Sequence, residues 1–200
     1  MATILHPIHR DAPSATTTTT DGLARHDVAI TRDGNSATRS AAVSFLLAAT
    51  RLSLGWIFLW AFLDKAFGLG HETAQADAWI RGGSPTAGFL GHATAGPFAD
   101  FYQSFAGAAW ADWLFMIGLA GIGTALMLGV AMRIATGSGA LLLILMWTAV
   151  LPPANNPFMD DHLIYAMTLG LLALFGAHRV FGLGEAWEHL PLVKRFPILK

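Results

Sequence analysis

Four apolar stretches dominate the sequence after residue 40 and constrain its fold more than any other feature. They cover about residues 42–67, 110–132, 134–151 and 161–181. A helix rises about 1.5 Å per residue, so each stretch is about long enough to cross a bilayer core of roughly 30 Å. The residues are 54% hydrophobic and only 12% charged. We therefore predict an all-α fold, an integral membrane bundle of four transmembrane helices.

Composition divides the chain into three regions. Residues 1–40 have no apolar periodicity and contain the run Thr16 to Thr20, so we predict a disordered cytoplasmic tail there. Residues 41–190 form the predicted four-helix membrane domain. Residues 191–200 form a cytoplasmic C-terminal tail.

The connections between the stretches differ in length. A long outer loop covers about residues 68–109, and its aromatic segment Pro97 to Phe105 fits either a short interfacial helix over the bundle or a surface loop with an aromatic anchor. The second and third stretches meet in a tight turn near Arg133. A stripe of small residues on the second stretch predicts close helix packing or self-association, and consists of Gly121, Ala125 and Gly129.

Basic residues predict the orientation, because they favour the cytoplasmic side of a membrane. One side of the predicted bundle holds most of them: Arg25, Arg32, Arg39, Arg133, Arg179, Lys194 and Arg195. The other side holds only Lys65 and Arg81. We therefore expect both termini in the cytoplasm. Asp64, Lys65 and the turn at residues 151–162 should then converge on the outer side.

Charged residues inside the first stretch suggest function. A charge within a membrane span usually has a buried partner, so Arg51 is either such a residue or one that reaches towards the nearer interface. Arg51 and Lys65 fall near one helix face. Trp56, Trp60 and Asp64 are spaced by four and line another face, and the two tryptophans fit either an interfacial aromatic belt or a ligand site.

The turn at residues 151–162 places polar residues at a membrane boundary. Its prolines end one helix, and Asp160 or Asp161 is suited to cap the next. The following helix can bring three polar side chains together on one side, those of Asp161, His162 and Tyr165. Residues 161 and 165 are four positions apart and residues 162 and 165 are three apart, and such positions are neighbours on a helix. They fit either a proton-handling cluster or an N-cap beside a hydrated interfacial histidine and tyrosine.

The chain resembles the DoxX family of four-helix bacterial membrane proteins over about residues 42–190. The resemblance is carried by RLSLGWIFLWAFLDKAFGLG and NNPFMDDHLIYA, and by GGSPTAGFL and GPFADFY, which are similar to actinobacterial members. The positions that fit the family pattern are Arg51, Gly55, Lys65, Asp161 and His162. The family is similar to the quinone-reducing subunit of thiosulfate:quinone oxidoreductase, and related members anchor soluble thiol- and superoxide-handling enzymes. The resemblance implies a redox role in a bacterial plasma membrane.

Composition argues against several cofactors and partners. The chain has no cysteine, which excludes disulfides, thiolate nucleophiles and cysteine ligands for zinc or iron–sulfur clusters. His162 and His178, the histidines near the predicted spans, would lie about 24 Å apart along one helix and cannot ligate one haem. We expect no metal, haem or flavin. Scattered basic residues also argue against nucleic-acid binding.

The resemblance implies a quinone-linked redox subunit of the oxidoreductase type that acts on thiosulfate or a related sulfur compound. Without an evident electron carrier, electrons pass either directly from substrate to quinone or through a partner protein. Trp56, Trp60 and Phe58 are expected to wall a quinone slot, and Lys65 and Arg81 to attract the sulfur oxoanion. The candidate catalytic residues are His162, Asp161 and Lys65. The candidate cofactor-binding residues are Arg51, Trp56, Trp60, Asp64 and Tyr165.

Two other functions remain open. The first is a non-catalytic membrane anchor or assembly factor, in which buried charges fix the helix register. The cytoplasmic tails, including Lys194 to Pro197, then contact a soluble redox partner or second subunit. The second is a small-solute transporter, disfavoured because the sequence shows no inverted repeat. Each function is compatible with a homo-oligomer.

Overall fold

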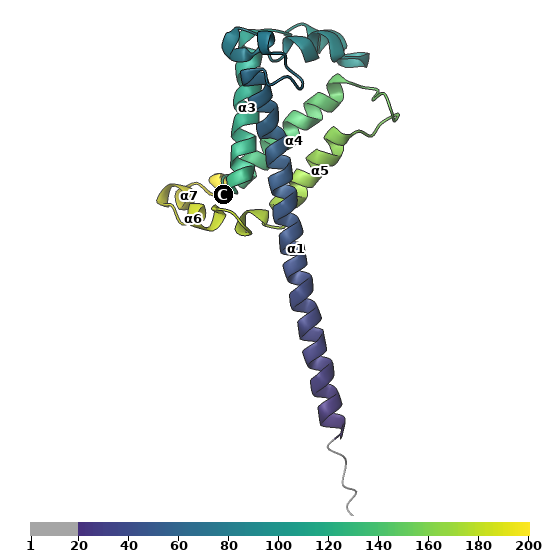
Figure 1. Cartoon of the computed structure of the whole chain (residues 1–200), viewed down its shortest axis with the longest axis vertical. Helices are drawn as coiled ribbons and strands as arrows, with labels where there is room; N and C mark the ends of the chain where they lie inside the picture. Colours follow the sequence, from purple (N-terminus) through teal and green to yellow (C-terminus); the bar gives the residue numbers. More distant parts are fainter. Residues whose placement is uncertain (1–19) are drawn as a thin grey trace, which may run out of the picture. The chain divides into compact units, whose positions relative to one another are not determined.

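A computed structural model describes the backbone of residues 20–200 and the side chains of residues 38–200. The described residues form helices and no strand. Three helices are long and apolar enough to cross a membrane: α1 (Thr20–Phe67) over its segment Thr38–Phe67, α3 (Ala109–Leu128) and α4 (Met132–Ala149). Figure 1 shows these helices. They confirm the predicted all-α membrane protein at this level.

Helix α1 begins at Thr20, whereas the sequence predicted a disordered tail through residue 40. No proline interrupts residues 20–67, and a nucleated helix extends at little cost per residue, so polar sequence can join an apolar helix. The part of the prediction that covers residues 1–19 lies outside the described residues. Residues Ala42–Lys200 form one compact unit, distinct from the chain before Ala42.

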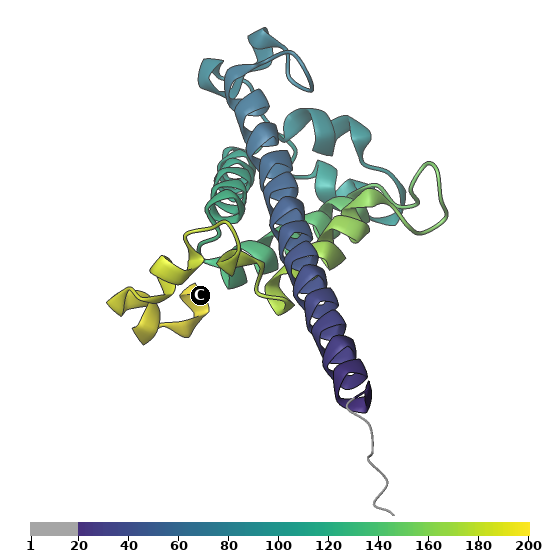
Figure 2. The same cartoon turned by 60° about the horizontal axis from the view of Figure 1, so that its bottom comes forward.

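The predicted hairpin of the second and third spans is confirmed. Gly129 ends α3 in a left-handed conformation, with a φ of 72°, and its N–H donates to Ala125 O at 2.8 Å. Glycine adopts this conformation without the steric cost that a Cβ brings. Helix α4 then packs against α3 and, more extensively, against α5 (Asp161–Leu174). Figures 1 and 2 show α4 and α5 side by side.

The fourth apolar stretch forms a shorter helix than predicted. We expected a span over residues 161–181, but α5 has 14 residues and ends at Leu174. Gly176 follows with a φ of 65°, and the short turn η5 (Ala177–Arg179) replaces further α-helix. At about 1.5 Å per residue α5 is about 21 Å long, less than a bilayer core. Four full-length crossing helices are therefore not confirmed.

Helix α1 contacts α3 at two glycines that the predicted stripe did not include. A Cβ at Gly123 would lie 2.6 Å from Leu59 N, and one at Gly55 would lie 3.0 Å from Leu126 Cβ. By contrast, a Cβ at Gly121 would meet no atom within 4 Å, and Gly129 serves as a helix cap. The expected packing role of this stripe is therefore confirmed only in part: Ala125 packs against the core, whereas Gly121 lies in open space and Gly123 lies on the face that meets α1.

Gly123→Ala should lower the free energy of unfolding by roughly 1–3 kcal/mol, because the added methyl group forces α1 away from α3. Thermal unfolding of the detergent-solubilised protein, followed by circular dichroism, measures the change. Gly121→Ala is the matched control on the same helix, and its better helix propensity should leave stability unchanged or higher. Equal losses in both variants would contradict the close contact at Gly123.

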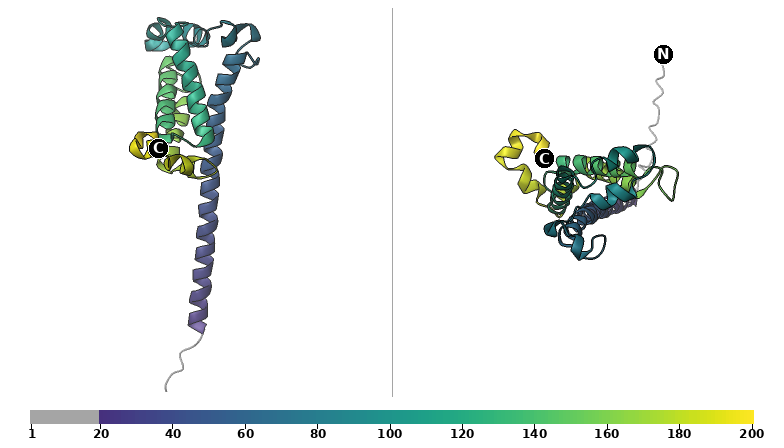
Figure 3. Two further views of the ribbon diagram at one scale, coloured as in Figure 1. Left: turned by 90° about the vertical axis from the view of Figure 1, so that its left-hand side faces the viewer. Right: turned by 90° about the horizontal axis from the view of Figure 1, so that it is seen from above.

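Short elements cover the two ends of the α3–α4 hairpin. After η1 (Gln75–Asp77) and η2 (Trp79–Arg81), residues 84–107 form a segment that we call the lid, with η3 (Phe89–Ala93), η4 (Gly96–Phe98) and α2 (Ala99–Gln103). The helical interpretation of Pro97 to Phe105 is thus confirmed over most of its length. Figures 1 and 3 show the lid at one end of the α3–α4 hairpin. Two further short helices, α6 (Gly184–Glu188) and α7 (Pro191–Arg195), lie at the other end.

Candidate functional site

Asp112 holds one side of the lid against the first turn of α3. Its Oδ1 accepts three hydrogen bonds, from Ser84 Oγ at 2.9 Å, Thr86 N at 3.0 Å and Thr86 Oγ1 at 2.6 Å. The Asp112 side chain is buried. Hydrogen bonds to a carboxylate are stronger than those between neutral groups, so this cluster is a firm attachment point.

The other side of the lid is attached to the last turn of α4. Ala95 N donates to Ala149 O at 2.9 Å, and the Tyr102 hydroxyl lies 2.6 Å from Thr148 Oγ1. Thr148 Oγ1 donates to Leu145 O, so Tyr102 is the donor in its pair with Thr148. The lid therefore bridges α3 and α4 across their shared end.

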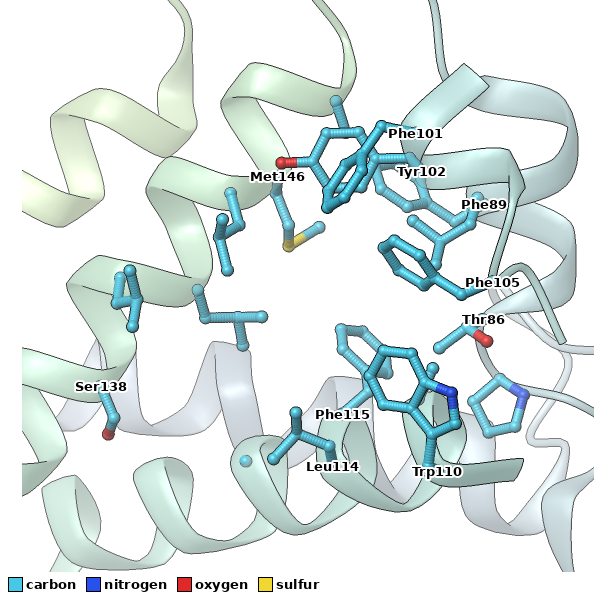
Figure 4. Close-up of a pocket in the computed structure, with 18 of the residues that line it drawn as sticks. Thr86, Phe89, Phe101, Tyr102, Phe105, Trp110, Leu114, Phe115, Ser138 and Met146 are labelled. Atoms are coloured by element: carbon cyan, nitrogen blue, oxygen red, sulfur yellow. The ribbon is translucent and has the colours of Figure 1, made fainter. Parts of the chain in front are cut away.

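A cavity of about 430 Å³ lies beneath the lid, between α3 and α4. Figure 4 shows the lid aromatics over it, with Trp110, Leu114 and Phe115 on α3 and Met146 on α4. Four rings form a continuous cluster, with centroid distances of 5.3–5.9 Å, and they belong to Phe101, Tyr102, Phe105 and Trp110. Such a volume and lining are typical of sites for small apolar ligands.

No charged side chain lines this cavity. Its threonine, serine and tyrosine hydroxyls are already hydrogen-bonded, whereas the indole N–H of Trp110 has no hydrogen bond within residues 38–200. Thr86 binds Asp112, Ser138 donates to Ile134 O, and Tyr102 binds Thr148. Among the three hydroxyls, that of Tyr102 can change partner most easily, because it gives up only one hydrogen bond. The cavity therefore favours a ligand with a large apolar part.

The cavity opens on the outer surface of the helix pair. Several lining residues are largely exposed, among them Phe101 at 63%, Trp110 at 61% and Leu114 at 66%. Because α3 and α4 are both apolar enough to cross a membrane, the surface around the cavity opening is suited to contact lipid. A lipid-soluble molecule could therefore enter from the side.

Arg51, predicted to bind a cofactor, is fully buried and binds backbone carbonyls instead. Its Nη1 donates to Leu126 O and Met127 O, and its Nη2 donates to Val180 O and Phe181 O at 3.1 and 2.9 Å. Its Nε has no hydrogen-bond partner among the described residues. Arg51 therefore has buried partners, as one of the two expectations held, and they are backbone carbonyls of α3 and of the residues after α5.

Asp64 and the two tryptophans lie around the turn after α1. The buried Asp64 carboxylate accepts hydrogen bonds from His71 N at 3.2 Å and Glu72 N at 2.9 Å. Trp60 packs against Trp56 at 5.7 Å and against His71 at 5.1 Å between ring centroids. Asp64 therefore fixes a turn, which explains its burial without a cofactor.

The residues of the predicted quinone slot on α1 have different environments in the structure. Phe58 is buried in the core, whereas Trp56 is about half exposed. Neither lines the cavity under the lid. Phe58 and Trp56 therefore lie on different faces of α1, Phe58 turned to the core and Trp56 outward.

At the start of α5, Asp160 rather than Asp161 is the closer partner of His162. Asp160 Oδ1 caps the helix by accepting from Leu163 N at 3.2 Å, and Asp160 Oδ2 lies 2.7 Å from His162 Nδ1. Asp161 Oδ1 is 3.5 Å from the same nitrogen, and its side chain is 69% exposed. Tyr165 is partly buried against the core.

Ligand atoms of Asp160, Asp161 and His162 lie within 4.8 Å of one another. Helix capping and the Asp160–His162 hydrogen bond account for this arrangement, so we assign no metal to it. A polar cavity of about 650 Å³ adjoins it, lined by both aspartates, by Ala93 and Ala95 of the lid, and by the turn after α4. This turn therefore has a water-accessible side.

Lys65 is half buried, and no hydrogen bond or ion pair joins it to another residue in the described part of the chain. The C-terminal end of α1 and the N-terminal end of α5 lie on different sides of the helix bundle in Figures 1 and 2. No contact joins Asp64 or Lys65 to His162 within residues 38–200. The expected convergence of these groups into one cluster is not observed.

The cavity under the lid was not predicted from the sequence. The aromatic segment that contains Phe101, Tyr102 and Phe105 was the available signal, but nothing in its spacing shows that α3 and α4 separate beneath it. Comparisons of the chain with protein-family models, with curated proteins and with solved structures found no significant match in any of the three.

Proposed function

We propose that the chain is a DoxX-like membrane protein that binds a quinone under the lid and acts as the quinone-linked subunit of a redox system. The observation that carries the proposal is the aromatic, uncharged cavity of about 430 Å³. Quinones are dissolved in the bilayer and combine a flat ring with an apolar tail. A side-opening apolar cavity suits both parts.

Tyr102 is the residue best suited to recognise the quinone ring. Its ring lines the cavity, and its hydroxyl donates to Thr148 at 2.6 Å. A quinone carbonyl can replace Thr148 as the acceptor, so the hydroxyl remains hydrogen-bonded in both states. The ring would stack against Phe101, Phe105 or Trp110, and the tail would extend towards Gly118 between α3 and α4.

Reduction of the quinone to a quinol takes two electrons and two protons. The electrons come from thiosulfate or a related sulfur compound, directly or through a partner protein, as the DoxX resemblance implies. The protons come from water on the side of the polar cavity, where His162 and Asp160 form a hydrogen-bonded pair. The exposed Asp161 carboxylate is in contact with solvent there.

In this proposal α5 and its flanking residues supply a fourth membrane crossing. The chain after α5 returns to the C-terminal end of α3, where Phe181 O accepts from Arg51 and Leu183 N donates to Leu128 O. The non-helical residues on either side of α5 make up the missing length. Both termini are then cytoplasmic, and the lid and both cavities lie on the outer side.

Gly118→Phe tests the quinone site directly. Gly118 lines the cavity, and a Cβ there meets no atom within 4 Å, so a phenylalanine fills the cavity without displacing a neighbouring helix. We expect the affinity for a menaquinone analogue to fall at least tenfold, or about 1.4 kcal/mol or more. Titration of purified protein in nanodiscs, followed by tryptophan quenching, measures it.

Gly121→Phe is the matched control, because Gly121 lies in equally open space on the same helix but does not line the cavity. Its quinone affinity should equal that of the original chain. Unchanged binding in Gly118→Phe would overturn the site. If the folded original chain binds no quinone, the redox function fails and the anchor function takes its place.

A further inference from the structure

The residues after α5 form a folded unit rather than a tail. We call residues 177–200 the C-terminal platform; it contains η5, α6, α7 and η6 (Pro197–Leu199). Trp187 Nε1 donates to Leu199 O at 2.6 Å, and His178 Nε2 lies 2.9 Å from Glu188 Oε1. Val193 is fully buried within this unit.

The platform is fixed to the end of the α3–α4 hairpin that lies opposite the lid. Leu183 N donates to Leu128 O at 2.8 Å, and Arg133 N donates to Lys200 O at 2.8 Å. Arg133 Nη1 also donates to Pro197 O at 3.1 Å. Figures 1 and 3 show α6 and α7 projecting to the side of this end. The platform therefore begins where two membrane-length helices end.

Large apolar side chains cover the outside of this small unit. Six of them are exposed by 45–76%: Phe181, Leu183, Leu190, Leu192, Phe196 and Ile198. Soluble domains rarely display so many together, so a partner or a membrane is expected to cover them. Their position at the helix ends matches the boundary between acyl chains and headgroups.

Basic residues accompany these apolar side chains. The platform and the adjoining start of α4 carry five of them, Arg133, Arg179, Lys194, Arg195 and Lys200, against two acidic residues, Glu185 and Glu188. Glu188 is already paired with His178 and Arg179. In residues 38–200 no ion pair involves Lys194 or Arg195, and both side chains are exposed.

We propose that the C-terminal platform lies on the bilayer surface and binds anionic lipid headgroups. Leu192 and Arg195 are three residues apart in α7, so an apolar and a basic side chain share one of its faces. Side chains such as Leu192 enter the boundary of the acyl region, while Lys194 and Arg195 contact lipid phosphates. Attachment to the ends of α3 and α4 favours lipid over a soluble protein, because a bilayer that surrounds these helices also meets the platform.

A single-cysteine label tests this surface, and the chain is suited to it because it contains no other cysteine. We would label Leu192→Cys with an environment-sensitive fluorophore and reconstitute the full chain, one copy per nanodisc. The discs would contain phosphatidylcholine alone or with increasing phosphatidylglycerol. We expect a blue-shifted emission that grows with the anionic lipid and reverses in high salt, because salt screens surface charge.

We would then add Lys194→Gln or Arg195→Gln to the labelled chain. Each should raise the phosphatidylglycerol fraction at which half of the blue shift is reached, since each basic residue contributes roughly fivefold to the affinity for anionic lipid. Arg81→Gln removes the same charge from an exposed position outside the platform and should have no effect. Water-like emission in every lipid would overturn the proposal. Emission that shifts only when two copies share a disc would also overturn it and would identify a second copy as the partner.

Discussion

Arg51→Met is expected to lower the free energy of unfolding by about 3–5 kcal/mol, because buried carbonyl groups lose hydrogen bonds to a charged donor. The substitution keeps most of the side-chain volume and removes the donors that serve four carbonyls. Leu126 O and Met127 O lie at the end of α3, and Val180 O and Phe181 O follow α5. Each buried carbonyl left without a donor costs about 1–3 kcal/mol.

The C-terminal end of α3 explains why Arg51 matters so much. An α-helix leaves its last four carbonyls without donors inside the helix. Here Ala125 O accepts from Gly129 N and Val130 N, and Leu128 O accepts from Leu183 N. Arg51 serves the other two, those of Leu126 and Met127. Its positive charge also lies at the negative end of the helix dipole.

Thermal unfolding in detergent measures the effect of Arg51→Met. Lys65→Met is the matched control, because Lys65 is on the same helix and has no hydrogen bond or ion pair in the described part of the chain. Arg51→Lys should be intermediate, because one ammonium group cannot reproduce the guanidinium fork. Equal melting temperatures for Arg51→Met and Lys65→Met would contradict the capping role.

Asp112→Ala is expected to release the lid from α3. It removes the acceptor of three hydrogen bonds and leaves Thr86 N and two hydroxyl groups to find other partners. Hydrogen bonds to charged groups contribute about 1.5–3 kcal/mol each, so local opening should become at least tenfold more frequent. Hydrogen exchange of residues 84–107 measures this opening directly.

The same substitution should weaken quinone binding in the proposed function, because Thr86 and Phe105 would no longer be held over the cavity. Asp100→Ala is the matched control within the lid, since it removes the same charge from an exposed side chain. Asp112→Asn keeps one acceptor oxygen and should retain part of the attachment. Exchange in the lid that is equally fast in Asp112→Ala and Asp100→Ala would show that Asp112 does not hold it.

The sequence by itself determined the elements whose cause is local. Apolar length predicted α1, α3 and α4, because only a continuous run of apolar residues can satisfy the bilayer core. The turn at residues 151–162 was also recognised, and it contains the capping aspartate of α5. Choosing between Asp160 and Asp161 required coordinates, since both positions suit an N-cap and only Asp160 has an extended backbone there.

Tertiary structure decided the roles of the polar residues and the position of the cavity. Sequence reasoning detected that Arg51 and Asp64 were unusual, but their partners are backbone atoms far along the chain or in an adjoining turn, which carry no residue signature. The cavity depends on how far α3 and α4 separate and on how the lid bridges them. These distances arise from contacts between distant segments, such as Asp112 with Thr86 and Tyr102 with Thr148, and helical periodicity contains no information about them.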